Sequence, residues 1–205
     1  AIWKALNYFY CQRISTEIPW YQPFHCNQDA QSYHPDTPHI RRLVPGGWFD
    51  AGDLTQITEQ TAPITYLLFE YAEKIAKEGG DQKLYDRIIE EGKWGLDWLL
   101  KTNFGDGYRT NLIWYYNNFT IKNFSNGIPG DQDDPVRSAT NCPLKNFMVS
   151  AAEIQAYKVL KDSDSNLARH ALTMAQEDWK QAVLKEEEWM NDVGGHYRHH
   201  KNMNT

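Results

Sequence analysis

Two pairs of helical segments limit most strongly what this 205-residue chain can fold into. Apolar residues recur at helical spacing over 63–79 and again over 81–103, with a Gly-Gly stop between the two segments. A second pair follows over 143–161 and 163–184, and it starts about 80 residues after the first without close sequence identity to it. This pattern predicts an all-α fold, an array or toroid of repeated helical hairpins.

The segments outside the hairpins have weaker patterns. Residues 1–12 read as a further helix with bulky side chains on most faces, and five prolines between 15 and 47 exclude a long helix there. Residues 105–141 read as a long loop in which Trp114-Tyr115-Tyr116 forms an aromatic patch or a short strand. Pro63 is expected in the first turn of the helix over 63–79. Asn141 is expected to cap the helix over 143–161.

The length of the chain is that of one domain or of part of a larger one. A closed toroid of six such hairpins would need about 480 residues, so we expect residues 1–205 to form a single partial domain, less than half of a toroid. The rest of that domain would then be a partner. The chain opens at Ala1 without an initiator Met or a leader, which is typical of a processed or cut amino terminus.

Charge and hydropathy exclude two kinds of partner. The formal net charge is −6 and the sequence has no basic block, which argues against binding to nucleic acid or to an anionic membrane surface. Its longest apolar stretch, 64–72, contains Glu70 and is too short for a membrane span.

One segment carries the chemistry. It is Gly46-Gly47-Trp48-Phe49-Asp50-Ala51-Gly52-Asp53, between the proline-rich stretch and the first hairpin. Asp50 and Asp53 can turn both carboxylates toward one water molecule, because Gly52 gives the backbone between them unusual freedom. Mutual repulsion favours a division into a base and an orienting partner. Alternatively, Gly46-Gly47 is a plain tight turn and one aspartate caps a helix.

The segment resembles the signature of glycoside hydrolase family 9, the cellulase family. The resemblance to this family spans roughly residues 5–161. Outside the segment 46–53 it rests on three stretches: Tyr8 to Arg13, Asp29-Ala30 and Trp94 to Lys101. The resemblance implies a fold that is part of an (α/α)6 toroid built from helical hairpins with long loops. It also implies inverting cleavage of β-linked glucans or related chains.

The resemblance also assigns roles. Asp53 would be the general base that activates water, and Asp50 would help to hold that water. The general acid of the family is a Glu far downstream, and no position here matches it, so we expect this acid outside the chain. Glu186, Glu187 and Glu188 form a solvated charge run and are not candidates.

Metal binding is a weaker expectation. Some family members hold structural zinc through positions that correspond here to Ile14, His25-Cys26 and Leu54, so two ligands are missing and we expect no structural zinc. No other cofactor is expected to be required.

Calcium remains possible, since the family often holds one. Asp131, Asp133 and Asp134 begin like a calcium loop, but Val136 and Cys142 stand where an EF-hand needs Gly and Glu. The preferred interpretation is a solvated acidic loop, partly neutralised by Arg137.

The substrate class follows from the same resemblance. We expect a β-glucan or a related carbohydrate, with Trp114, Tyr115 and Tyr116 as rings that stack on sugars at the rim of a cleft. A secreted, periplasmic or cell-surface location is expected from the family. Two alternatives stay open: a carbohydrate-binding relative without turnover, suggested by Leu54 after the second aspartate, and a helical scaffold that binds protein.

Overall fold

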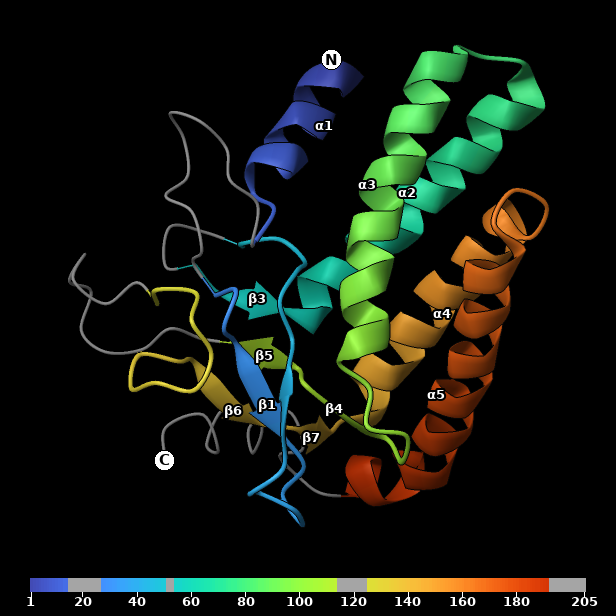
Figure 1. Ribbon diagram of the computed structural model, residues 1–205. Helices are drawn as coiled ribbons and strands as arrows, with labels where there is room; N and C mark the ends of the chain where they lie inside the picture. Colours follow the sequence, from blue (N-terminus) through green and yellow to red (C-terminus); the bar gives the residue numbers. More distant parts are fainter. Residues whose placement is uncertain (15–26, 51–53, 114–124, 192–205) are drawn as a thin grey trace.

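The computed structural model describes residues 1–14, 27–50, 54–113 and 125–191. The five helices among these residues are α1 (Ile2–Cys11), α2 (Thr58–Glu78), α3 (Gln82–Lys101), α4 (Pro143–Leu160) and α5 (Ser165–Asn191). Helices α2 and α3 form one hairpin and α4 and α5 a second one, and the two hairpins lie side by side (Figure 1). The hairpins that the periodicity predicts are therefore confirmed.

The helix starts differ from the prediction in two places. Helix α2 begins at Thr58, so Pro63 lies inside it and the prediction that this proline occupies the first turn is wrong. The earlier start is fixed by tertiary contacts, because the Thr58 amide donates to the carbonyl of Asn111 at 3.1 Å. The residue that caps α4 is Cys142, and Asn141 belongs to a strand, so the predicted cap is also wrong.

The main core lies where the hairpins meet. One cluster of fully buried residues joins α2 and α3 to α4 and α5: Phe69, Leu96, Ala156, Leu160, Ala168 and Ala171. A second cluster joins α2 and α3 to α4: Ala62, Trp98, Leu99, Val149 and Ala152. The many alanines on α4 and α5 allow the two helices to approach closely, while aromatic and branched side chains from the first hairpin fill the remaining space. None of the described helices is long and apolar enough to cross a membrane.

Short strands occur where the sequence predicts irregular loops. A three-stranded sheet has β1 (Gln31–Tyr33) at its centre, antiparallel to β2 (Arg41–Leu43) and parallel to β6 (Val136–Ser138). Two further pairs are β3 (Gln56–Ile57) with β5 (Leu112–Ile113) and β4 (Tyr108–Arg109) with β7 (Thr140–Asn141). The possible strand at 114–116 lies outside the described residues. These strands lie beside the helices and not within their layers (Figure 1).

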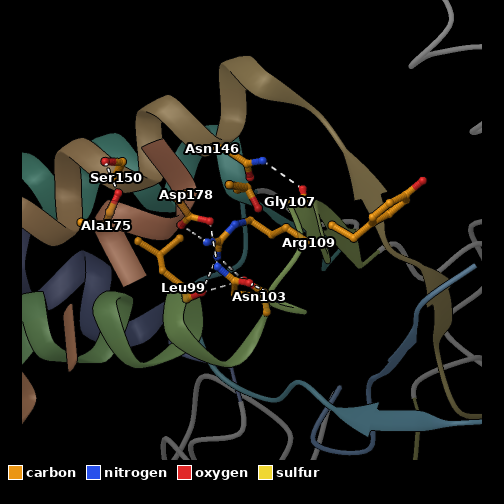
Figure 2. A network of polar contacts seen from close by, with 12 residues as sticks. Leu99, Asn103, Gly107, Arg109, Asn146, Ser150, Ala175 and Asp178 are labelled. Atoms are coloured by element: carbon orange, nitrogen blue, oxygen red, sulfur yellow. Dashed lines mark hydrogen bonds and ion pairs between the residues drawn. The ribbon is translucent and has the colours of Figure 1, made fainter. Parts of the chain in front are cut away.

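A buried polar network ties the strands to the hairpins (Figure 2). Arg109 on β4 forms an ion pair with Asp178 on α5, and both side chains are almost completely buried. The guanidinium also donates to the hydroxyl of Thr102 at 2.8 Å, at the end of α3. Asn103 donates to the other oxygen of Asp178 at 2.7 Å. The network therefore fixes the end of α3 against α5.

Candidate active site

The segment Gly46–Asp50 follows β2 and lies against helix α3. The indole N–H of Trp94 donates to the carbonyl of Gly47 at 2.7 Å, and that of Trp98 donates to the carbonyl of Val44 at 3.2 Å. The two tryptophans are four residues apart and so project from one side of α3. Their ring N–H groups hold the backbone of the segment from one side.

Glycine is required where the segment passes α3. Gly47 has φ +71°, a left-handed conformation that side chains disfavour, and a Cβ added there would lie 3.1 Å from Cγ of Trp98. Gly46 has φ +112° and its carbonyl accepts a hydrogen bond of 2.7 Å from Gln56. The Gly-Gly pair therefore allows the backbone to approach the tryptophan closely.

Trp48 points away from these contacts and into the core. Its indole N–H donates to Oε1 of Glu91 at 2.8 Å, and Arg13 donates to both oxygens of the same carboxylate at 3.1 and 2.9 Å. Glu91 is completely buried, so its charge depends on these partners and on Arg87, 3.1 Å away. The ring of Trp48 passes over Gly95, where a Cβ would lie 2.4 Å from Cη2.

The chain after α1 holds the segment from the other side. The amide of Phe49 donates to the carbonyl of Gln12 at 2.9 Å, and the amide of Ile14 donates to the carbonyl of Gly47 at 3.0 Å. These two bonds form a short antiparallel bridge between Arg13 and Trp48. Backbone bonds and indole N–H groups thus fix the chain up to Asp50 from both sides.

Asp50 is bonded to described residues that follow 51–53. Its amide donates to the carbonyl of Thr55 at 3.0 Å, and its half-buried carboxylate lies 3.5 Å from the side-chain amide of Gln60. Leu54 has φ +61°, and its carbonyl accepts a bond of 3.0 Å from the side chain of Asn27. The described residues on both sides of 51–53, Asp50 and Leu54, are therefore held by hydrogen bonds, while Asp53 itself lies outside the described residues.

The predicted aromatic residues Trp114, Tyr115 and Tyr116 also lie outside the described part of the chain. Ile113, the residue before them, is buried and pairs with Gln56 across the β3–β5 ladder. The described chain just before the aromatic segment therefore lies beside Gln56, which follows Thr55.

The two zinc positions that are described carry no ligand atoms. Ile14 is completely buried and packs with Phe49 and Leu54 in one apolar cluster. The His25-Cys26 pair lies outside the described residues.

One acidic group among the described residues could hold a metal ion, and it combines Asp29 with Asp133 and Asp134. It shares two aspartates with the predicted acidic loop, while Asp131 stays outside it. Asp131 and Asp133 instead share a hydrogen bond, which raises the pKa of Asp133 and lowers the pKa of Asp131.

Sequence reasoning missed Glu91 and Asn27. Glu91 follows Ile88 by three residues on the apolar side of α3, and a charge in such a stripe is a signal of a buried partner. Asn27 has φ +56°, and no local pattern distinguishes it from other polar residues of a loop. Its role depends on a contact with Leu54 that only the tertiary structure shows.

Two packed helical hairpins that carry such a segment on their loop side define a class of all-α proteins built from repeated hairpins. The family model described as "Glycosyl hydrolase family 9" matches residues 1–204, and the chain belongs to this family. Among curated proteins, the chain is 24% identical to endoglucanase C of Cellulomonas fimi over 220 residues.

Solved structures show the same fold. A thermostable endoglucanase from Alicyclobacillus acidocaldarius, as a single mutant, has a TM-score of 0.66 at 19% identity, and a family 9 protein of Bacteroides ovatus has 0.67 at 18%. Both matches cover 89% of this chain, but 36% and 37% of the respective relatives. The match to endoglucanase C covers 88% of this chain and 19% of that protein. The chain therefore spans about a fifth to just over a third of these relatives.

Proposed function

We propose that this chain is the amino-terminal part of the catalytic domain of an inverting hydrolase of β-linked glucans. In this proposal Asp53 is the general base and Asp50 orients the attacking water. The general acid is a Glu outside this chain.

The observation that carries the proposal is the anchoring of Asp50. Its backbone follows a segment held by Trp94, Trp98 and the end of α1, and the loop that it begins closes on Thr55. A catalytic carboxylate must keep its position while charge develops on the reacting atoms, and a rigid support supplies that order before the reaction. A plain surface turn would not need three anchors of this kind.

The chemistry of inversion fits two carboxylates that share one water. A base must remove a proton from water as the water attacks the anomeric carbon, while an acid on the opposite side protonates the leaving oxygen. The base and acid carboxyls stand roughly 6.5–9.5 Å apart in such enzymes, which leaves space for the water. Asp50 and Asp53 are too close in sequence to serve as that pair, so both belong to the water side.

The substrate class rests on the relatives. The curated relative is an endoglucanase, and a solved structure that matches at a TM-score of 0.67 is a complex with cellobiose-like isofagomine. In this chain the rings of Trp114, Tyr115 and Tyr116 would stack on pyranose faces, next to the ladder of Ile113 and Gln56. An extracellular or cell-surface location goes with such a polymeric substrate.

The test is Asp53→Asn in the full-length protein, with Asp97→Asn on the exposed side of α3 as the matched control. Loss of a general base lowers kcat by about 10²–10⁴-fold, so D53N should fall in that range on a soluble β-glucan while D97N stays near the wild type. Proton NMR of the first product should show the α-anomer. Unchanged turnover in D53N, or a β-anomer as first product, would contradict the proposal.

The carbohydrate-binding alternative has one observation in its favour. Leu54, next to the proposed base, packs into the apolar cluster with Ile14 and Phe49 and offers no polar atom of its side chain to a sugar. Saturable binding of cello-oligosaccharides to the wild-type full-length protein without any hydrolysis would favour this alternative.

A further inference from the structure

Gln56 is a glutamine that the fold buries completely, at the start of β3. Its backbone pairs with Ile113 on β5. Helix α2 then begins at Thr58, whose amide donates to the carbonyl of Asn111 at 3.1 Å. Strand pairing and the start of a helix therefore hold the backbone of Gln56, and its side chain extends from a base that the fold fixes.

The side chain of Gln56 reaches back to the chain before the proposed site. Its amide Nε2 donates to the carbonyl of Gly46 at 2.7 Å, a buried bond between residues ten positions apart. Gly46 precedes Asp50, and Gln56 follows the second aspartate of the pair, Asp53. One hydrogen bond therefore joins the chain before both aspartates to the chain after them.

The carbonyls of 44–47 accept bonds from side chains on two different parts of the protein. Two of the donors are the indole N–H groups of Trp94 and Trp98, which both belong to α3. Gln56 is a third donor, and it lies after the aspartates. The tryptophans thus fix this stretch to the helix, whereas Gln56 fixes it to the chain that follows the pair.

Stability alone does not explain an amide at this position. The other polar atom of the side chain, Oε1, is buried and has no hydrogen-bond partner among the described residues. A buried polar group without a partner is unfavourable, and an apolar side chain of the same size would avoid that cost. Such exceptions to good packing are expected at functional sites. What the amide of Gln56 adds is the donor to Gly46.

We propose that Gln56 is a positioning residue for the aspartate pair. This inference rests on the proposed function of Asp50 and Asp53. Gln56 ties Gly46 to the chain after the pair, and the bond of 3.0 Å from the amide of Asp50 to the carbonyl of Thr55 is a second tie. Two carboxylates can share one water only while both keep their positions, so the loss of a tie lowers turnover and not substrate binding.

Kinetic constants separate this role from a role in placing the aromatic segment. Gln56 pairs with Ile113, the residue before the rings that are proposed to stack on sugars. Misplaced rings weaken binding of the substrate and raise KM, whereas a misplaced base lowers kcat and leaves KM near the wild-type value. A positioning role for the aspartates predicts the second result.

The test is Gln56→Met in the full-length protein, because methionine has a similar length but no N–H donor. Gln155→Met is the matched control: Gln155 is also buried, and its amide donates to Glu73 on α2 at 2.8 Å. On a soluble β-glucan, kcat of Q56M should fall by about 10–100-fold, since a misplacement of about 1 Å can cost that much. The KM of Q56M and both constants of Q155M should stay near the wild type.

Hydrogen exchange tests the same support without a substrate. In the wild type the amide of Asp50 donates to the carbonyl of Thr55, which protects it from exchange. This amide should exchange faster in Q56M than in the wild type and in Q155M. Faster exchange confined to Q56M supports the tie between Gly46 and Gln56 even if the protein hydrolyses no glucan.

Three results would overturn the role of Gln56. They are a wild-type kcat in Q56M, a raised KM with unchanged kcat, or exchange at Asp50 that is equal in Q56M and the wild type. Asp53→Asn is measured alongside. An inactive D53N with a fully active Q56M rejects the role of Gln56 alone, whereas wild-type turnover in D53N rejects the proposed function as well.

Gln56→Asn covers the case in which Q56M does not fold. Its side chain keeps the amide but is one methylene shorter, which draws the donor away from the carbonyl of Gly46. The same fall in kcat at unchanged KM is expected. A folded Q56N with the kcat of the wild type would overturn the positioning role.

Discussion

The indole N–H of Trp48 donates to the buried carboxylate of Glu91 at 2.8 Å. Trp48 lies two residues before Asp50, and Glu91 is also held by Arg13 from the chain after α1. One carboxylate thus links α3, the end of α1 and the segment before the proposed site. The segment that leads to Asp50 is therefore anchored at this junction.

Removing the charge at the junction should destabilise the fold. Glu91→Gln keeps the shape of the side chain but leaves Arg13, whose side chain is only 8% exposed, without its main counter-ion. Loss of one partner of a buried ion pair costs about 3–5 kcal/mol. Urea unfolding followed by tryptophan fluorescence should show a loss of this size.

Glu90→Gln is the matched control for this change. Glu90 also contacts Arg13, at 3.2 Å, but its side chain is 57% exposed. An exposed pair contributes about 0–1 kcal/mol. Equal losses in E90Q and E91Q would show that burial does not govern the strength of this junction.

Gly95 should tolerate no side chain. A Cβ there would lie 2.2 Å from the hydroxyl of Thr65 and 2.4 Å from the ring of Trp48, so Gly95→Ala must displace the ring or the helix. We expect a loss of about 1–3 kcal/mol from overpacking. Gly92→Ala is the comparison, because its nearest contact is 3.1 Å to the ring of Phe69 and alanine favours the helix by about 1 kcal/mol. An equal loss of stability in G92A and G95A would contradict this explanation.

Trp94→Phe should lower activity at only a small cost in stability. The carbonyl of Gly47 would lose the indole N–H but would still accept from the amide of Ile14 at 3.0 Å, so it is not left unpaired. The expected loss of stability is about 1 kcal/mol. The kcat of the full-length protein should fall severalfold, because the support of the segment before Asp50 is weaker. Trp179→Phe, at a ring that is 57% exposed, should leave kcat unchanged.

Glu153 should make the stability depend on pH. Burial, followed by the charge of Asp178, raises the pKa of Glu153 well above its ordinary value of 4.5. The folded protein therefore holds this proton more tightly than the unfolded chain does. The contribution to stability is fully present below about pH 4.5 and is lost as the pH rises through the raised pKa.

Glu153→Gln removes this titration. The difference in free energy of unfolding between E153Q and the wild type should grow in favour of the variant as the pH rises from 4.5, and then become constant. Thermal unfolding across the pH range measures it, with Glu187→Gln on the exposed side of α5 as the control. A difference that stays constant across the range would contradict a raised pKa.

The hairpins could be predicted from the sequence because their signals are local, and the segment 46–53 was noticed for the same reason. Helical periodicity is set by neighbours three and four residues apart, and the Gly-Gly-Trp-Phe-Asp run is contiguous. The start of α2 was predicted wrongly because Thr58 is held by Asn111, a residue 53 positions later. Helix propensity contains no information about such a contact.

The rest of the site depends on pairs that are distant in the sequence. Arg13 meets Glu91, and Asp29 meets Asp133 and Asp134, across 78 and about 100 residues. The parallel pairing of β1 with β6 joins two strands of only three residues each, too short for a visible alternation. The acidic loop was recognised as a motif, but its buried partner Asp29 could be identified only once the chain was folded.

Chemical rescue shows whether Asp53 is the base. In Asp53→Ala of the full-length protein, sodium azide can attack the anomeric carbon without a base, because it is already an anion. The substrate is an activated β-glucoside or cello-oligosaccharide. If Asp53 is the base, azide restores turnover of this substrate and the product is the α-glycosyl azide. Two results would show that Asp53 is not the base. D53A could turn over substrate at the wild-type rate without azide, or it could lose turnover that azide does not restore.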